Sequence, residues 1–449
     1  MTTVPEKVEQ AYGQLPAGWR LEKLKFFASV FNSNVDKTIA ENEEPVRLCN
    51  YTDVYYNNHI TPDLDFMEGS ATTAEVEKFQ LKGGQVIITK DSEGWDDIGI
   101  PALVTEDMPN VLCGYHLSVL EPGLDLDGGF LSWLCRSEPL NDQFKLGANG
   151  VTRYGLGQYP MKNAYIALPR VETQRRIARF LDEKTARIDA LIEKKRMLLD
   201  RLAEESQARI THAVTKGLNP DAPLKSSRVN WLGDVPAHWE VLPVKRVAKL
   251  ESGHTPDKKI DAYWENCDIP WVSLNDTAVL RSADYISDTR FNINALGLAN
   301  SSARLLPPRA VVFTRDATIG ESAITTRSMA VSQHIIAWLC NEERIVPEFL
   351  LLVIYGMTAE LLRLTNGSTI STIGLSDVKS IVVALPPLKE QSEIISATFD
   401  GKGKIAIVSS QIEASISRLV EYRAALVAAA VTGKIQLDAM PKEPALEEV

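Results

Sequence analysis

The sequence repeats itself across most of its length, and this repetition constrains the fold more than any other feature. Three segments recur in the same order: 15–28 (LPAGWRLEKLKFFA) as 235–248 (VPAHWEVLPVKRVA), 166–177 (IALPRVETQRRI) as 383–394 (VALPPLKEQSEI), and 213–218 (AVTKGL) as 430–435 (AVTGKI). The Gly150/Thr152 pair also returns as Gly367/Thr369. A chain that repeats at this spacing is expected to build two similar structural units. The sequence therefore predicts a pseudo-twofold protein.

Two long helices are predicted, one in each repeat. From Gln174 to about Thr215 the sequence contains no Pro or Gly and is rich in Arg, Lys, Glu, Leu and Ala. Steps of three and four residues place apolar side chains on one seam in each repeat, which is the 3.5-residue spacing of a coiled coil. The predicted seam consists of Ile177, Leu181, Ile188, Leu198 and Leu202 in the first helix and Ile394, Ile405, Val408, Ile412 and Leu419 in the second. Each helix needs a partner, and the other helix of the same chain can supply it.

The remaining segments have the pattern of mixed α/β domains. Short β-rich runs such as QVIIT at 85 and AVVFT at 310 are separated by Gly, Asn, Asp and Pro, which is typical of strands and turns. Apolar segments at 130–136 and 347–364 are predicted to be helices that cover a sheet. The predicted division of the chain is a first domain at 1–169, a helix at 170–218, a linker and second domain at 219–386, a helix at 387–440 and a tail at 441–449.

Composition sets weaker limits on the class of protein. The formal net charge is −11, and residues 1–169 hold 13 basic and 24 acidic groups. This balance weakens a nucleic-acid function without excluding it, because binding needs only a local positive potential. Five scattered cysteines suggest neither a zinc site nor a disulfide framework. The sequence shows no secretion signal and no apolar run of about 20 residues, so we expect a cytoplasmic protein without a membrane segment.

We find no motif that predicts catalysis, metal binding or a bound cofactor. Gly433-Lys434 is followed by Ile435 and has no glycine five positions before Gly433, so the Walker A phosphate loop is missing. The six histidines are dispersed and none has a helical i, i+4 partner. His116 and His334 occupy comparable places in the two halves, and for these we expect satisfied core side chains rather than ligands.

Two polar loops recur in the two halves and are the candidate DNA contacts. The first polar loop, 90–95 and 315–320, follows a predicted strand, and the second, 150–154 and 367–372, precedes the last predicted strand. A basic residue at a strand end can reach a phosphate or a guanine edge. The alternative is that both loops are simple turns. The candidate DNA-binding residues are Lys90, Arg153 and Tyr154 in the first half and Arg315, Thr318, Ser368 and Thr369 in the second.

Four segments of the second half together resemble one known family. WLGDVPAHWEV (231–241), GHTPDKKIDAYWENCDIPWVSLND (253–276), GSTISTI (367–373) and VALPPLKEQSEI (383–394) resemble the specificity subunit of type I restriction-modification enzymes. The first half departs from this pattern, with RLCNYTDVYYNN (47–58) where the second half has its G-x-T-P and I-P-W signatures. The two halves are therefore expected to recognise different DNA sequences.

The resemblance implies a complete mechanism for the chain. Two target recognition domains would each read one half of a bipartite site in double-stranded DNA, and the two long helices would pack antiparallel as a spacer. Two modification subunits would dock beside these domains and methylate adenine at N6; whether two restriction subunits also join stays open. The chain itself would be non-catalytic, with S-adenosylmethionine, ATP and magnesium on the partner subunits.

Two other classes of function stay open on the residues alone. The acidic charge favours a coiled-coil adaptor that binds proteins and makes no DNA contact. An enzyme in its own right is the third alternative, although no N-P-P-Y methyltransferase tetrapeptide or nuclease triad is present. The acidic run Asp91, Glu93, Asp96 and Asp97 would repel phosphate unless it faces away from DNA or accepts hydrogen bonds from cytosine.

Overall fold

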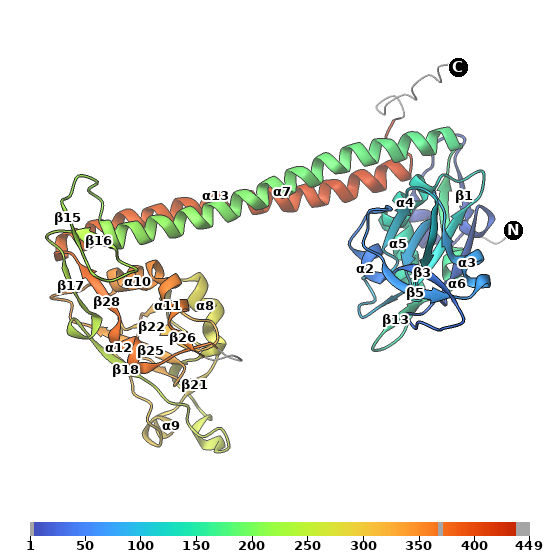
Figure 1. The fold of residues 1–449 in the computed structure, drawn as a ribbon. Helices are drawn as coiled ribbons and strands as arrows, with labels where there is room; N and C mark the ends of the chain where they lie inside the picture. The colour runs from blue at the N-terminus through green and yellow to red at the C-terminus, as the bar shows by residue number, and fades with distance from the viewer. Residues whose placement is uncertain (1–3, 367–370, 437–449) are drawn as a thin grey trace. The chain divides into compact units, whose positions relative to one another are not determined.

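The computed structural model describes residues 4–366 and 371–436 (Figure 1). The chain forms two compact units, and neither coincides with one of the predicted domains. Unit 1 comprises Met1–Lys195 and Ala414–Val449, and unit 2 comprises Arg196–Glu413. Each globular domain is thus grouped with part of both long helices, whereas the sequence analysis divided the chain into consecutive segments.

Unit 1 contains a five-stranded sheet and a four-stranded sheet. The larger has the order β2 (Ala28–Asn32), β11 (Leu117–Pro122), β7 (Val86–Thr89), β9 (Pro101–Val104), β4 (His59–Ile60), and the smaller β5 (Met67–Ala71), β3 (Glu44–Cys49), β10 (Met108–Cys113), β6 (Gln80–Leu81). In β7, Ile87 shares a core with the smaller sheet, whereas Val86 and Ile88 share a core with Phe130 of helix α4 (Gly128–Arg136). The central strand is apolar throughout because both of its faces are covered.

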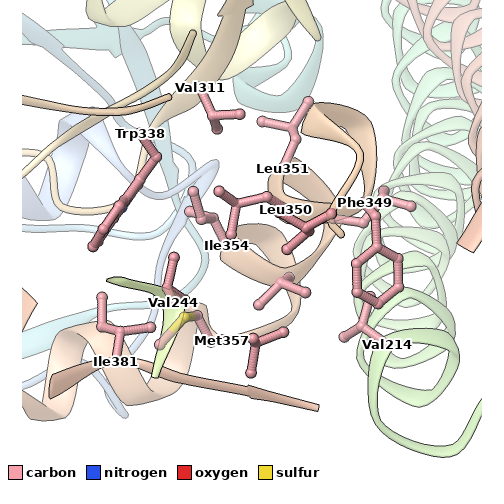
Figure 2. Close-up of a cluster of buried hydrophobic side chains, with 14 of the residues drawn as sticks. Val214, Val244, Val311, Trp338, Phe349, Leu350, Leu351, Ile354, Met357 and Ile381 are labelled. Carbon is pink, nitrogen blue, oxygen red and sulfur yellow. The ribbon is translucent and has the colours of Figure 1, made fainter. Parts of the chain in front are cut away.

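Unit 2 repeats this arrangement strand for strand in its larger sheet. The order is β18 (Ala248–Ser252), β25 (Ile335–Cys340), β22 (Val311–Thr314), β23 (Ser322–Thr325), β20 (Tyr285–Ile286), and the three-stranded sheet is β21 (Asn292–Ile293), β19 (Ile269–Val272), β24 (Ala330–Val331). In both units the short last strand of the five pairs in parallel with its neighbour. Figure 2 shows helix α10 (Pro347–Gly356) between the sheet and a long helix, with Val311 and Trp338 on one side of it and Val214 beside Phe349.

The repeated sequence segments pair with each other inside each unit. Strand β1 (Arg20–Lys23) runs antiparallel to β14 (Tyr165–Leu168), and β17 (Glu240–Pro243) runs antiparallel to β28 (Val382–Leu385). The beginning and end of each domain therefore meet directly before a long helix starts.

The other elements are short. In unit 1 they are α1 (Glu6–Tyr12), η1 (Leu24–Phe26), α2 (Tyr51–Tyr55), α3 (Thr73–Phe79), β8 (Asp91–Ser92), α5 (Glu138–Gly147), β12 (Ala148–Asn149), β13 (Tyr154–Leu156) and α6 (Gln158–Asn163). In unit 2 they are β15 (Leu224–Ser226), β16 (Asp234–Pro236), η2 (Val244–Arg246), η3 (Asp261–Tyr263), η4 (Leu274–Asp276), α8 (Thr277–Ser282), α9 (Ala295–Ala299), α11 (Thr358–Arg363), β26 (Thr365–Asn366), β27 (Thr372–Ile373) and α12 (Leu375–Ser380).

The long helices are α7 (Val171–Lys216) and α13 (Leu388–Val431). A buried glutamine fastens the first turns of each helix to the globular domain. Gln174 accepts a hydrogen bond from the Asp127 amide at 2.8 Å and donates to the carbonyls of Asp125 and Pro169. Gln391 makes the same three contacts with the Val346 amide and the carbonyls of Arg344 and Pro386. These contacts explain why the repeated segment contains Leu-Pro followed by glutamine.

Each unit contains contacts between the two long helices. In unit 1 the start of α7 shares a core with the end of α13, through residues such as Leu181 and Val427. The Arg423 Nε lies 2.9 Å from the Asp189 Oδ1 in the same unit. In unit 2 the end of α7 and the start of α13 line one surface pocket, with Ile210 on one helix and Thr398 on the other.

The seam of these helices differs from the predicted one. In α7 the positions that face inward run from Ile177 to Ala213 in ten steps, with a mean of 3.6 residues per step. The equivalent positions of α13 lie 217 residues later in the sequence. In α7 the buried or half-buried positions are Ile177, Leu181, Thr185, Ile188, Ile192, Lys195, Leu199, Leu202, Ser206, Ile210 and Ala213. In α13 they are Ile394, Thr398, Lys402, Ile405, Ser409, Ile412, Ile416, Leu419, Arg423, Val427 and Ala430.

The seam prediction is therefore wrong at Leu198 and Val408. These side chains are 45% and 43% exposed, and the next residue in each helix, Leu199 or Ser409, takes the inner position. The prediction assumed a 3.5-residue repeat, whereas a helix with 3.6 residues per turn drifts from that repeat by about 20° per heptad. The other eight predicted seam residues lie at buried or half-buried positions.

A tryptophan packs on a glycine at the C-terminus of each long helix. Gly217 and Gly433 have φ values of +74° and +73°, as expected for a helix C-terminal cap. A Cβ on Gly217 would lie 3.1 Å from the Trp239 ring, and one on Gly433 would lie 3.2 Å from the Trp19 ring. The repeated tryptophan and the repeated glycine are thus parts of one contact in each unit.

Candidate nucleic-acid interface

In unit 1 the first polar loop begins where the central strand β7 ends. Lys90 follows this strand, and its Nζ lies 2.9 Å from the Asp91 Oδ2. The same carboxylate oxygen lies 2.8 Å from the Nδ1 of His116, in the turn before β11. Lys90 is 13% exposed and His116 is 33% exposed. Neighbouring strands of the sheet therefore bring a cation, a carboxylate and an imidazole together, although the histidine lies 25 residues from the aspartate.

The second polar loop of unit 1 joins the first. Strand β13 pairs with β8, so that Tyr154 lies opposite Ser92, and the Arg153 Nη2 lies 3.4 Å from the His116 Nδ1. The structure thus brings all three candidate residues of the first half, Lys90, Arg153 and Tyr154, into one place. Their role as DNA contacts stays a prediction.

Unit 2 contains the same arrangement. Arg315 follows the central strand β22, and its Nε lies 3.5 Å from the Asp316 Oδ2. The Nδ1 of His334, in the turn before β25, lies 2.6 Å from that oxygen. Arg315 is 22% exposed and His334 is 41% exposed. We call Lys90, Asp91 and His116 the first cluster, and Arg315, Asp316 and His334 the second cluster.

The second polar loop of unit 2 also meets its cluster. Asp316 forms a β-bridge with Thr372, and the amide of Ala317 donates to the Ser371 carbonyl at 2.9 Å. The Thr318 hydroxyl lies 3.4 Å from the Thr277 hydroxyl and points toward α8 rather than toward Arg315. The two remaining candidates, Ser368 and Thr369, lie outside the described residues.

The two histidines correct one expectation from the sequence. His116 and His334 are partly exposed and paired with aspartates, so they are not core side chains. Sequence reasoning missed them as site residues because only strand pairing shows their partners. The available signal was their matched position in the two halves, each just before the strand that follows.

One acidic group of the first loop, Asp91, is paired with cationic partners within unit 1. Burial alone would raise the pKa of Asp91, but hydrogen bonds from His116 and Lys90 outweigh this effect and lower its pKa below the ordinary value. Asp97 accepts a hydrogen bond from the Tyr55 hydroxyl at 2.9 Å. The charge of Asp91 is therefore already paired, whereas the Asp97 carboxylate is held by a neutral hydroxyl.

Unit 1 also carries tyrosines that the sequence analysis did not select. Tyr51 and Tyr55 on α2 stack with their ring centroids 5.4 Å apart, and Tyr56 meets Tyr55 edge to face at 5.1 Å. Tyr56 is 77% exposed. Beside the first cluster, the Lys90 Nζ lies 4.8 Å from the centroid of Tyr115. The only sequence signal was the segment RLCNYTDVYYNN, which departs from the second half.

Unit 2 has a distinctive loop of its own, which follows strand β18. A Cβ on Gly253 would lie only 1.5 Å from the Val331 carbonyl oxygen, so residue 253 must be glycine to sit against this strand. The loop that follows carries exposed Lys258 and Lys259. It is fixed at its far end by Trp264, whose indole N–H donates to the Asp257 carbonyl at 3.2 Å.

Neither a metal centre nor a membrane segment is found in the part of the chain that the structure describes. Within residues 4–366 and 371–436, no three His, Cys, Asp or Glu side chains are placed to hold a metal ion. No described helix combines the length and apolarity needed to cross a bilayer.

Comparison with known proteins gives a consistent result. Residues 23–200 and 236–418 match the family described as type I restriction modification DNA specificity domain. The chain is 21% identical over 389 residues to the putative type I restriction enzyme MjaX specificity subunit of Methanocaldococcus jannaschii, covering 85% of this chain and 86% of that protein. The MjaIX specificity subunit of the same organism is 29% identical over 165 residues, 36% of this chain and 38% of that protein.

Solved structures show the same fold at low sequence identity. The HsdS subunit from Thermoanaerobacter tengcongensis has 17% identity and a TM-score of 0.57, over 94% of this chain and 98% of that one. A chain from a study of the complex assembly and conformational transition of the type I R-M system has 17% identity and a TM-score of 0.73, over 94% of this chain and all of that one. The predicted mixed α/β fold with two repeated domains is therefore confirmed.

Proposed function

Because the chain belongs to the family of type I restriction modification DNA specificity domains, we propose that it reads the DNA sequence for such an enzyme. In this proposal each unit recognises one half of a bipartite target in double-stranded DNA. The single observation that carries the proposal is that one domain fold, matched twice by the family, presents a polar cluster at the same strand end in both units. The adaptor alternative is not favoured, since neither a family match nor a duplicated site supports it.

We further propose that α7 and α13 pack as an antiparallel coiled coil that sets the distance between the half-sites. The contacts within each unit support this arrangement, because the start of one helix meets the end of the other. Helices of 46 and 44 residues are about 65–70 Å long at 1.5 Å per residue. Two helical turns of DNA span about 70 Å, so each long helix is about as long as two turns of DNA.

The long helices also support a proposal for the partners. Large apolar side chains lie exposed on them at Leu191, Met197, Leu198, Ile407, Val408, Val420 and Tyr422. Exposed apolar side chains gathered on one element are typical of protein interfaces. We propose that two modification subunits dock here and carry the adenine-N6 methyl transfer, with S-adenosylmethionine bound by them. Restriction subunits, with ATP and magnesium, would be further partners; this chain contributes no catalytic residue.

Selection from a pool of random-sequence duplexes tests the proposal. The full chain, purified with the modification subunits from its host, is expected to enrich two defined sequence blocks separated by a gap of fixed length and random composition. Enrichment of one continuous block, or of none, would contradict it.

Insertion of four residues after Lys195 and four after Ile412 tests the spacer role. We expect both sequence blocks to be retained and the gap to grow by about two base pairs, since four helical residues add about 6 Å. The matched control is a four-residue insertion after Asn219 in the linker, which should leave the gap unchanged. An unchanged gap after the paired helix insertions would show that the helices do not set it.

A further inference from the structure

The first and second clusters have the same arrangement of residues in the two units. In both, a cation follows the central strand, the next residue is an aspartate, and a histidine in the turn before the neighbouring strand holds that aspartate through its Nδ1. In both, the edge of the second polar loop pairs with the aspartate, at Gly155 in unit 1 and Thr372 in unit 2. The match covers three side chains and the backbone around them.

The histidine is the member of each cluster that can reach a ligand. Lys90 and Arg315 are mostly buried, while His116 and His334 are two to three times as exposed. An imidazole whose Nδ1 faces a carboxylate is held in one orientation and presents its Nε2 outward, as a donor when the ring is protonated. The His334 Nε2 lies 3.1 Å from the side-chain nitrogen of Gln333, and the Gln333 Oε1 accepts a hydrogen bond from the Thr255 hydroxyl at 2.6 Å.

The surroundings of the two clusters are different. Unit 1 places Arg153 and Tyr115 beside the first cluster, and Tyr55 of α2 donates a hydrogen bond to Asp97 of the loop that follows the cluster's aspartate. In unit 2 the segment that corresponds to α2 begins with the same type of capping box, at Ser273 and Asp276, but continues without tyrosines. The residues around the two clusters therefore differ in chemistry, although the clusters themselves are alike.

If the proposed function holds, the shared clusters and their different surroundings have different roles in binding DNA. Two domains that read different half-sites need unlike groups where they touch base edges, because each base pair presents its own donors and acceptors in the major groove. The phosphodiester backbone is the part of DNA common to every half-site. We infer that His116 and His334 contact backbone phosphates of their half-sites, held in place by Asp91 and Asp316, and that the tyrosines of α2 read bases in the first half-site.

The test uses the full chain with its modification subunits and the duplex enriched by the selection above. His116→Gln and His334→Gln are each expected to keep both sequence blocks, to lower affinity by roughly ten-fold, as for the loss of one charge-assisted hydrogen bond, and to reduce the salt dependence of binding by about one phosphate. Matched controls are His59→Gln in unit 1 and His212→Gln in unit 2, both exposed and outside the clusters. Tyr56→Ala is expected to relax the first block only.

Duplexes with single methylphosphonates make the test independent of any change in folding. Neutralising the contacted phosphate should weaken the wild-type complex but should weaken the matching histidine variant no further. The inference is overturned if a histidine variant changes the sequence of its block, behaves like its control, or still responds to every methylphosphonate as wild type does. If the wild-type complex selects no bipartite sequence, the proposed function fails instead, which is a distinct result.

Discussion

Replacing Gln391 with leucine is expected to destabilise unit 2 by about 3–5 kcal/mol. The side chain is completely buried and satisfies the Val346 amide and the carbonyls of Arg344 and Pro386. Leucine is similar in size but leaves the three buried or partly buried backbone groups without this partner, and a buried group without a partner costs about 1–3 kcal/mol. The loss would also free the start of α13 from the loop before α10, so we expect the spacer to lose its fixed attachment.

Chemical denaturation of the full chain measures this effect. Gln411→Leu is the matched control, since this glutamine lies on the same helix and is exposed. Gln174→Leu should produce a similar loss in unit 1, because its three contacts are equivalent. A destabilisation of less than about 1 kcal/mol at either position would show that the glutamine is not what fastens the helix.

Gly253→Ala is expected to have the second large effect, at the start of the loop that distinguishes unit 2. The added methyl carbon would lie 1.5 Å from the Val331 carbonyl oxygen, and that atom belongs to a buried strand that cannot move away. The backbone at 253 must shift, which would break the hydrogen bond from the His254 amide to the same carbonyl. We expect a destabilisation of about 3 kcal/mol or more, typical of severe overpacking.

The consequence for recognition should be confined to one half-site. In the duplex selection, Gly253→Ala is expected to lose the second sequence block while keeping the first. Gly401→Ala is the control: this helical glycine has no atom within 4 Å of the added methyl, so alanine should stabilise α13 by about 0.5–1 kcal/mol. Loss of both blocks, or of neither, would contradict the assignment of this loop to one half-site.

Most of the architecture was predictable because the same sequence segments occur in both halves of the chain. The repeat predicted two similar mixed α/β domains, and apolar runs such as AVVFT predicted the central strands, since a strand covered on both faces has no polar alternation. The predicted division placed the long helices at 170–218 and 387–440; α7 spans Val171–Lys216, and α13 begins at Leu388 but ends at Val431 rather than near 440.

The errors in the seam have a physical origin. Leu198 and Leu199 are adjacent and equally apolar, so composition cannot decide which faces inward. At the corresponding place in α13, polar Ser409 is half-buried and apolar Val408 is exposed. The helical repeat of 3.6 residues decides both positions, whatever the side chain.

The clusters could not be predicted because their histidines lie far in the sequence from the aspartates that they contact. Lys90 and Arg315 could be selected because they follow recognisable strands, but His116 lies 25 residues from Asp91 and His334 lies 18 residues from Asp316. Those pairs exist only because β7 lies beside β11 and β22 beside β25. The order of strands in a sheet is set by tertiary packing. The sequence alone therefore does not show which aspartate each histidine contacts.

In the proposed function, two duplicated units each read half of one DNA site and direct methylation by partner subunits. Mapping methylated adenines across the genome of a strain that expresses this chain with its modification subunits tests it most directly. We expect methylation at one bipartite sequence, made of two defined blocks with an unread gap of constant length, and we expect it to disappear when this chain is deleted. Methylation that follows a continuous sequence, or that persists without this chain, would contradict it.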